Sequence, residues 1–241
     1  MKITFVGTSH GVPEKNRYCT CIMLESGGAV YFIDAGAPIV DFLARKGKSI
    51  NDLRAVFTTH VHSDHTVGIV HLVNLMNWYY KKSSAEIFIT EQEHIDATAR
   101  WTYTAGDGNI DTDRIKFKLP TEGCVYRDEN IKVEYIATAH MKNSYAILVT
   151  EGEKRVLFGG DLSHGLRKKD MPTVINENLD GFVCELAHFT MEELTPYLEA
   201  CKAKRLFFIH AKPKRYADIE AIKGKYPFEV NAPDDLDEFI L

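Results

Sequence analysis

Three histidines and an aspartate fall within six consecutive positions, in the run Thr59-His60-Val61-His62-Ser63-Asp64-His65. A buried neutral imidazole needs hydrogen-bond partners, and a divalent metal ion meets that need. Imidazole and carboxylate both suit zinc and other first-row metals. Side chains of an extended segment alternate with period two, so His60 and His62 point the same way and Asp64 and His65 can turn toward a second ion. The run predicts a metal site.

Three further potential ligands each follow an apolar run with the character of a strand. His140 follows 133–139, Asp161 follows 156–160 and His210 follows 205–209. Loops at the ends of strands gather into sites, so we expect these three side chains to join the histidine run.

The elements that position these residues alternate between strands and helices. Patterns of period two and glycine punctuation predict strands at 2–6, about 20–25, 29–34, 55–57, 86–90, 131–137, 145–150, 154–159, 180–184 and 205–209. Apolar residues at helical spacing predict helices at 38–46, from Asp64 to before Lys81, and at 91–101, 191–202 and 216–223. Groups of strands followed by helices favour an α/β architecture in which two sheets pack together and helices cover their outer faces. We expect a single domain over 1–241.

Composition narrows the class of protein. The net charge of −5 argues against a surface built for non-specific nucleic-acid binding. No run approaches the ~18 apolar residues of a membrane span, and the N-terminus lacks a signal peptide's apolar segment. Five scattered cysteines form no disulfide framework, which favours a cytoplasmic location, and Cys19 and Cys21 are expected to be structural.

The segment 102–114 is rich in glycine and polar residues and is expected to be an exposed loop. Aromatic residues nearby in sequence, at 78–80, 101 and 103, leave two interpretations open. The segment either forms a lid beside the site or is a surface loop whose aromatic residues pack in the core or against a partner subunit.

The ligand pattern resembles the metallo-β-lactamase-fold hydrolases along nearly the whole chain. The resemblance includes Phe32-Ile33-Asp34-Ala35-Gly36, similar to the aspartate–glycine motif that buttresses the metal loop, together with Gly68 and the turn Gly159-Gly160-Asp161. It implies a four-layer αβ/βα sandwich with two divalent ions, zinc in the first place and Mn or Fe as alternatives. It also implies that His60, His62 and His140 bind one ion, that Asp64, His65 and His210 bind the other, and that Asp161 bridges them. An aspartate at this position argues against β-lactam hydrolysis.

Two ions about 3.5–4 Å apart lower the pKa of a shared water, so a metal-bridging hydroxide is the expected nucleophile and Asp64 the expected catalytic aspartate. Other motifs resemble the tRNase Z and phosphodiesterase branch. The turn Gly7-Thr8-Ser9-His10-Gly11-Val12-Pro13 places His10 near the substrate, and Ala187-His188-Phe189-Thr190 resembles a motif whose histidine assists proton transfer. The ending His210-Ala211-Lys212-Pro213-Lys214-Arg215-Tyr216 is also similar, and Lys212 and Arg215 would favour a phosphate.

Two departures from the tRNase Z pattern bear on the substrate. A glycine-rich insertion for gripping tRNA is not apparent, and of the glutamate–alanine–threonine motif only Glu185 has a counterpart. We therefore expect a small molecule or short phosphodiester rather than bulk tRNA as substrate, no membrane partner, and a homodimer as one arrangement open to the chain. A lactonase or thioesterase with the same metal site is the main alternative, and a diiron redox module is a second one that the retained His62 disfavours.

Overall fold

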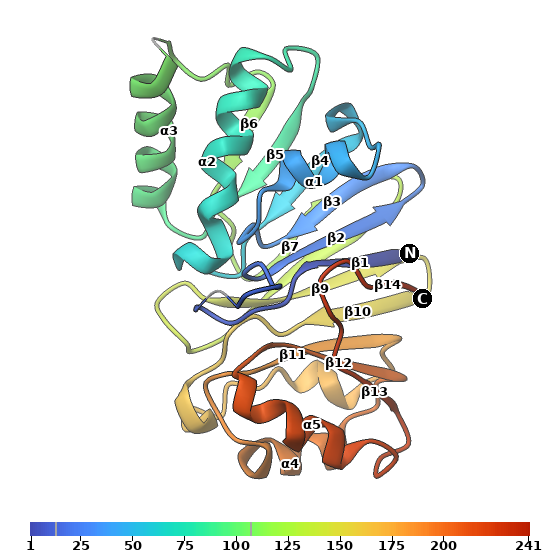
Figure 1. Ribbon diagram of the computed structural model, residues 1–241. Helices are drawn as coiled ribbons and strands as arrows, with labels where there is room; N and C mark the ends of the chain where they lie inside the picture. The colour runs from blue at the N-terminus through green and yellow to red at the C-terminus, as the bar shows by residue number, and fades with distance from the viewer. Residues whose placement is uncertain (13, 107) are drawn as a thin grey trace.

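Two seven-stranded β-sheets pack face to face in the residues that the computed structural model describes, 1–12, 14–106 and 108–241 (Figure 1). Pro13 of the N-terminal turn and Asp107 of the expected loop lie outside these residues. The first sheet has the order β14 (Glu238–Ile240), β1 (Lys2–Gly7), β2 (Cys21–Ser26), β3 (Ala29–Ile33), β4 (Leu53–Phe57), β5 (Ala85–Phe88) and β6 (Ile115–Lys118). The second has the order β13 (Glu229–Asn231), β12 (Arg205–Ala211), β11 (Gly181–Leu186), β10 (Lys154–Phe158), β9 (Tyr145–Glu151), β8 (Lys132–Ala137) and β7 (Gly123–Arg127).

Helices cover the outer face of each sheet. Figure 1 shows α1 (Ile39–Arg45), α2 (Ser63–Trp78) and α3 (Gln92–Gly106) outside the first sheet, and α4 (Met191–Ala200) and α5 (Tyr216–Ile222) outside the second. Short 3₁₀ turns are η1 (Ile50–Asp52), η2 (His164–Leu166), η3 (Thr173–Asn176) and η4 (Pro213–Arg215). The four layers confirm the expected αβ/βα sandwich. Among the described helices, none has the length and apolar character that a membrane crossing requires.

The alternation of side chains along β3 shows how one strand serves two cores. Val30 and Phe32 pack in the core beneath α1 and α2, whereas Tyr31 and Ile33 pack between the sheets. All four are buried, because successive side chains of a strand point to opposite faces and here both faces are covered. This explains why strands at the centre of the fold read as continuous apolar runs.

The segment expected to be a loop from 102 onward begins as helix, because α3 continues to Gly106. Hydroxyl groups support the extra turns: Thr98 Oγ1 donates to the carbonyl of His94 (2.9 Å), and Thr102 Oγ1 donates to that of Thr98 (3.0 Å). A threonine that bonds the carbonyl four residues earlier is accommodated in a helix despite its low propensity. The sequence prediction therefore ended this helix about one turn too early.

The residues after α3 contact the C-terminal end of α2. Asn77 Nδ2 donates to the carbonyl of Asn109 (3.3 Å), and Asn77 Oδ1 accepts from the backbone N–H of Asp111 (3.0 Å). The predicted metal ligands Asp64 and His65 lie at the other end of α2, and a helix of 16 residues is about 24 Å long. The interpretation as a lid over this chain's own site was wrong.

Asp128, in the turn between β7 and β8, joins the two sheets. Its Oδ2 accepts from the hydroxyl of Tyr31 on β3 (2.5 Å) and from that of Tyr126 on β7 (2.8 Å). Its Oδ1 accepts from the backbone N–H groups of Asn130 and Ile131, each at 2.8 Å. Burial acts to raise the pKa of Asp128, but the hydrogen bonds from Tyr31 and the backbone prevail and lower it below 3.8.

We expect Asp128→Asn to lower the free energy of unfolding by about 2 kcal/mol near neutral pH, because several charge-assisted hydrogen bonds are lost at a site partly open to solvent. The folded-state pKa is lowered, so the contribution of the carboxylate is present above the ordinary value of 3.8 and is lost as pH falls through the folded-state value. Urea unfolding of the metal-free proteins at several pH values tests this. Asp113→Asn, at an exposed position, is the matched control. The prediction would be contradicted if the difference in unfolding free energy between Asp128→Asn and the unmodified protein did not become smaller in acid.

Candidate metal centre

The seven predicted ligands come together where strands of both sheets end. His60 and His62 follow β4, Asp64 and His65 open α2, and the others come from the second sheet. His140 follows β8, Asp161 follows β10 and His210 lies near the end of β12. The buried members of the set are His60, His65, Asp161 and His210.

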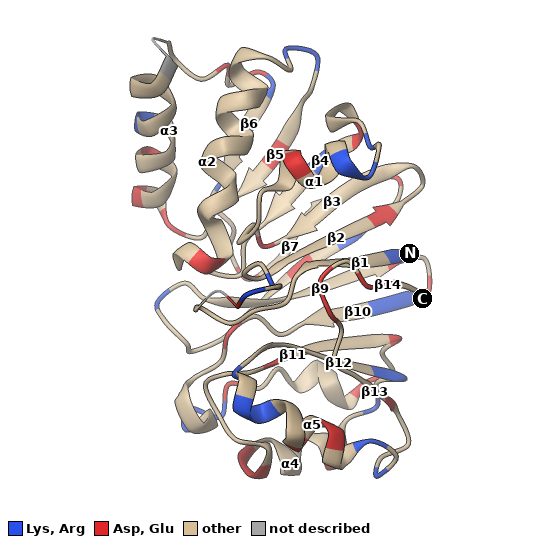
Figure 2. Cartoon of the chain, viewed as in Figure 1, with Lys and Arg blue, Asp and Glu red and all other residues tan. Residues whose placement is uncertain are grey.

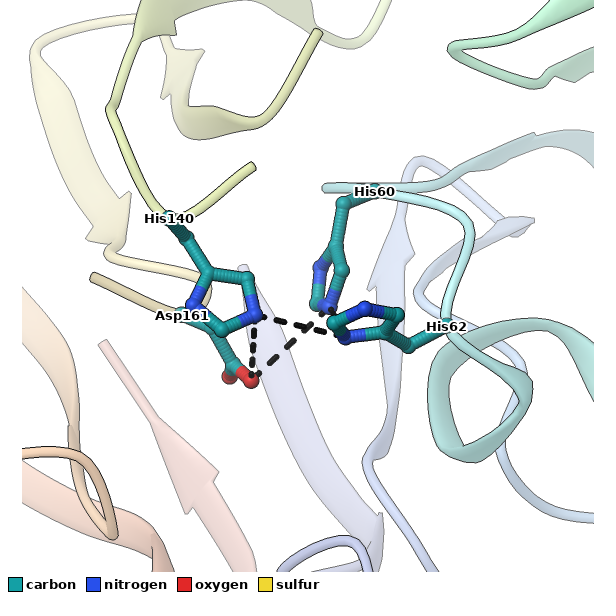
Figure 3. Close-up of side chains that lie close together, drawn as sticks. All are labelled: His60, His62, His140 and Asp161. Atoms are coloured by element: carbon teal, nitrogen blue, oxygen red, sulfur yellow. Dashed lines mark hydrogen bonds and ion pairs between the residues drawn. The ribbon is translucent and has the colours of Figure 1, made fainter. Parts of the chain in front are cut away.

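Figure 3 shows four of these side chains, from three separate segments, pointing toward one another. His62 Nδ1 lies 3.0 Å from His60 Nε2 and 3.3 Å from His140 Nε2. Asp161 Oδ2 lies 3.8 Å from both His60 Nε2 and His140 Nε2. One ligand atom of each residue falls within 4.8 Å of the others, so the four could hold a single ion.

Asp64, His65 and His210 form a second group with the same spacing. His65 Nε2 lies 3.5 Å from Asp64 Oδ2, and His210 Nε2 lies 4.0 Å from that oxygen. Asp161 reaches this group too, with Oδ1 3.5 Å from His65 Nε2 and Oδ2 3.4 Å from His210 Nε2. Asp161 is thus placed between the two groups.

The donor set fits divalent cations. His65 Nε2 and Asp161 Oδ1 are buried, and neither has a hydrogen-bond partner among the described residues. Burial acts to raise the pKa of Asp161, but His210 and His65 prevail and hold it well below its usual range. Burial likewise acts to lower the pKa of His65, but Asp161 and Asp34 raise it well above its usual range. The cluster therefore favours positive charge beside His65 Nε2, which a divalent ion supplies in place of a proton.

Asp34, just after β3, orients both parts of the histidine run. Its Oδ2 accepts from His65 Nδ1 (2.8 Å), and its Oδ1 accepts from the backbone N–H of Thr59 (2.7 Å). The bond to Nδ1 leaves Nε2 of His65 as the ligand atom. A side chain at Gly36 would meet the carbonyl oxygen of Asp64 at 1.9 Å, and one at Gly68 that of Ala37 at 2.2 Å. Both glycines therefore let α2 approach the Asp34 segment closely.

A family model described as "Anti-Pycsar protein Apyc1" matches residues 1–228. The chain belongs to this family. A ribonuclease Z of Nitrosopumilus maritimus is 40% identical over 88 residues, 36% of this chain and 29% of that protein, and one of Methanocaldococcus jannaschii is 30% identical over 156 residues, 64% of this chain and 49% of that protein. The chain spans a third to a half of the length of such curated relatives.

Solved structures share the fold of this Apyc1-family chain. The metallo-β-lactamase fold protein YhfI from Bacillus subtilis has a TM-score of 0.78 at 18% identity, covering 99% of this chain and 98% of that one. Human tRNase Z, short form, has a TM-score of 0.76 at 18% identity, covering 100% and 99%. Zn²⁺-bound PqqB from Methylobacterium extorquens has a TM-score of 0.71 at 12% identity, covering all of both chains. The metallo-β-lactamase fold and the resemblance to the tRNase Z branch are confirmed.

In this Apyc1-family chain, His188 lies at the rim of the ligand cluster. Its Nδ1 is 2.9 Å from both carboxylate oxygens of the buried Glu185 and 3.7 Å from Asp161 Oδ2. Glu185 also accepts from the backbone N–H groups of Leu162 (2.8 Å), Ala187 and His188 (each 2.9 Å). Burial acts to lower the pKa of His188, but Glu185 prevails and raises it. Glu185 thus fixes the ring through Nδ1.

The other predicted substrate contacts are near the cluster. A side chain at Gly11 would lie 3.1 Å from Asp64 Oδ2, so the turn that carries His10 lies against that ligand. Lys212 and Arg215 flank η4 beyond His210 and line a cavity together with His188. Cys21 packs in the core beneath α1 and α2, in keeping with its expected structural role.

Asp170 is a positioning residue that sequence reasoning missed. Its Oδ2 accepts from the backbone N–H groups of Ala139 and Ser163, each at 2.9 Å, and its Oδ1 accepts from Ser163 Oγ at 2.5 Å. These backbone groups lie one residue before His140 and two after Asp161. Nothing in the run Lys168-Lys169-Asp170 distinguishes it from a surface turn, so only the fold identifies this role.

We expect Asp170→Ala to weaken metal binding by about 10–100-fold, the usual cost of losing a group that orients ligands. Competition with a chromogenic chelator measures the affinity, and circular dichroism verifies the fold. The exposed Asp113→Ala is the matched control and should bind metal like the unmodified protein. Equal affinity of the Asp170 and Asp113 variants would contradict the positioning role.

Proposed function

We propose that this protein is a metal-dependent phosphodiesterase that uses two divalent ions. The position of Asp161 between two groups of ligand atoms is the observation that carries the proposal. A carboxylate in this position can contact two ions with its two oxygens, which is the arrangement suited to in-line displacement at phosphorus. The ribonuclease Z relatives support the same class of reaction.

His60, His62 and His140 would hold one ion, Asp64, His65 and His210 the other, and Asp161 both, with zinc as the first candidate and Mn or Fe as alternatives. When bound, such a pair of ions supplies a water nucleophile of lowered pKa and polarises a phosphoryl oxygen. The mixture of imidazole and carboxylate ligands suits these metals.

The chain's own residues complete the reaction. Hydrolysis breaks one P–O bond, water supplies the hydroxyl to phosphorus, and the leaving oxygen needs a proton. His188 would donate that proton, and the bond from Nδ1 to Glu185, which favours the protonated ring, supports this role. Lys212 and Arg215 would attract the negative charge of the substrate, and the turn carrying His10 would border the substrate beside Asp64.

A small or short phosphodiester is the substrate that we propose. A precursor tRNA is the second candidate, because the curated relatives bear the name ribonuclease Z.

The acyl alternative, a lactonase or thioesterase, was based on aromatic residues that could contact an apolar acyl group. The exposed residues Tyr79 and Tyr80 directly follow α2, and the exposed Trp101 and Tyr103 lie toward the C-terminal end of α3. Tyr79 and Tyr80 are thus at the end of α2 opposite to Asp64 and His65, so this support is lost.

Turnover of bis-(p-nitrophenyl) phosphate by the metal-loaded protein tests the proposal, with lactone, thioester and precursor tRNA substrates assayed in parallel. We expect diester turnover that disappears with chelator and in His62→Ala. His71→Ala, an exposed histidine on α2, is the matched control and should retain activity. A metal-loaded preparation that hydrolyses none of the diesters would refute the proposal, and lactone or thioester turnover instead would establish the acyl alternative.

Three further expectations stay predictions: a single domain over 1–241, a cytoplasmic location and a homodimer. The exposed aromatic residues of α2 and α3 offer one surface for a second subunit. Light scattering would give the mass in solution, and limited proteolysis would reveal a domain boundary.

A further inference from the structure

A cavity of about 250 Å³ opens beside the metal-ligand cluster, between η2, α4 and η4. Its charged and titratable lining consists of His164, Arg167, His188, Glu193, Lys212 and Arg215. Figure 2 shows basic residues in blue immediately before α5, where η4 lies. The volume is somewhat below the range of about 300–1,000 Å³ for drug-sized ligands, and it suits a small polar group.

The cavity is electropositive. Arg167, Lys212 and Arg215 carry positive charge, and Glu193 is the one acidic residue among the lining residues. The Glu193 carboxylate is already engaged, since its Oε2 accepts from the backbone N–H of Thr190 (2.8 Å) at the N-terminus of α4. Even when the ion pair between Arg215 and Asp218 is counted, the basic side chains outnumber the acidic ones, and a net positive charge in a concave site favours an anion.

Arg215 has donor capacity that the fold leaves unused. Its Nε is buried with no hydrogen-bond partner among the described residues, and its Nη1 reaches Asp218 only at 3.4 Å. A buried guanidinium N–H without a partner is unfavourable, so the geometry suits an acceptor that arrives with a ligand. Phosphate oxygens match the guanidinium fork of arginine.

The imidazole of His188 is close to both the cavity and the ligand cluster. On one side, His188 Nδ1 lies 3.7 Å from Asp161 Oδ2, and the ring centroids of His188 and His140 are 4.6 Å apart. On the other side, the His188 and His164 centroids are 4.7 Å apart, and His164 lines the cavity. One substrate molecule can therefore place a phosphodiester at the cluster and a second group in the cavity.

We propose that this cavity binds a second phosphate group of the substrate, carried by the alcohol that leaves when the diester is cleaved. The inference rests on the proposed function: a diester at the ligand cluster has His188 on the side of the cavity, so the group that extends past His188 enters the cavity. The preferred substrate class is a diester of a phosphorylated alcohol, such as a short oligonucleotide with a terminal phosphate. Diesters without a second phosphate would be cleaved less efficiently.

Three dinucleotides test this: thymidylyl-thymidine and its derivatives with a terminal 5′- or 3′-phosphate. We expect kcat/KM of the metal-loaded protein to be about tenfold or more higher for one phosphorylated derivative than for the parent, as charge-assisted hydrogen bonds predict. The position of the favoured phosphate shows which alcohol leaves.

Arg167→Ala is the decisive variant, since this residue is exposed and its loss should not disturb the fold. We expect it to reduce the preference for the phosphorylated dinucleotide to about one, and Arg167→Lys to restore part of it. Arg100→Ala, an exposed arginine on α3, is the matched control and should keep the full preference. Calorimetry with thymidine 3′,5′-bisphosphate and thymidine 5′-monophosphate gives a second readout, and only wild-type protein should bind the bisphosphate more tightly.

The outcomes separate the two proposals. Equal kcat/KM for all three dinucleotides would overturn the inference and leave the phosphodiesterase proposal intact. If inorganic phosphate inhibits the wild type but not Arg167→Ala while the preference is absent, the cavity binds free phosphate and the inference is also wrong. If no dinucleotide is hydrolysed, the phosphodiesterase proposal loses its support, and calorimetry alone decides the cavity: bisphosphate binding that depends on Arg167 supports the subsite, and equal binding of the two nucleotides overturns it.

Discussion

We expect Asp161→Ala to lower kcat/KM for diester hydrolysis by at least about 10³-fold, because two-ion catalysis supplies several kcal/mol of transition-state stabilisation. Asp161 is the residue whose oxygens face both ligand groups, with His60 and His140 on one side and His65 and His210 on the other. Its loss should therefore reduce the metal content as well as the rate. Elemental analysis after gel filtration, together with steady-state kinetics, measures both quantities.

Asp161→Asn is the informative companion, since it keeps the shape and one oxygen but removes the charge. We expect it to retain more metal than the alanine variant and still to lose most of the activity. Asp113→Asn provides the matched control at an exposed position. Full metal content with unchanged kinetics in Asp161→Ala would contradict a bridging role.

We expect His188→Ala to lower kcat for a dinucleotide by about 10²–10⁴-fold while metal content stays the same, because the variant lacks the proton donor for the leaving oxygen. A p-nitrophenyl leaving group departs without a proton, so the loss for bis-(p-nitrophenyl) phosphate should be below about tenfold. The contrast between the two substrates is the measurement that identifies a general acid.

A different pattern would assign His188 another role. Its ring also lies within ligand distance of Asp161 and His210, so it could instead hold a metal ion. Loss of metal, with equal rate losses for both substrates, would support that assignment and contradict the general-acid role. Glu185→Gln should show a weaker form of the general-acid pattern, because Glu185 orients the His188 ring and does not itself contact the leaving oxygen.

The four strands missing from the sequence prediction share one property. The strands β6, β7, β13 and β14 lie at the edges of the two sheets, and their side chains are partly exposed. In the run Ile-Lys-Phe-Lys of β6, for example, only Ile115 is fully buried. Short edge strands of mixed polarity carry little pattern of their own, because pairing with a neighbour defines them rather than burial.

The seven ligand residues and the strands that carry them could be read from the sequence alone. The chemistry predicted for them depends on residue type, and their placement depends on local periodicity. His60 and His62 follow a buried strand, His140 and Asp161 each follow another, and His210 lies near the end of β12. Both kinds of information are contained in a few consecutive residues. The layered architecture could also be predicted from local patterns. Strands with apolar residues and helices with one apolar face must bury these surfaces against each other, which produces layers.

Contacts between distant segments were decided only by the tertiary structure. Asp170 holds the turn before His140, Asp128 joins the sheets through Tyr31, and Arg167 and Arg215 line the same cavity. Each relation spans tens of residues and depends on how strands pair and sheets pack. The aromatic residues after position 100 illustrate an error of the sequence prediction. Their composition and neighbours in sequence suggested a lid, but they belong to α3, whose C-terminal end lies away from the site. Local pattern thus determined which groups could bind metal, and packing determined which groups orient them and what lies beside them.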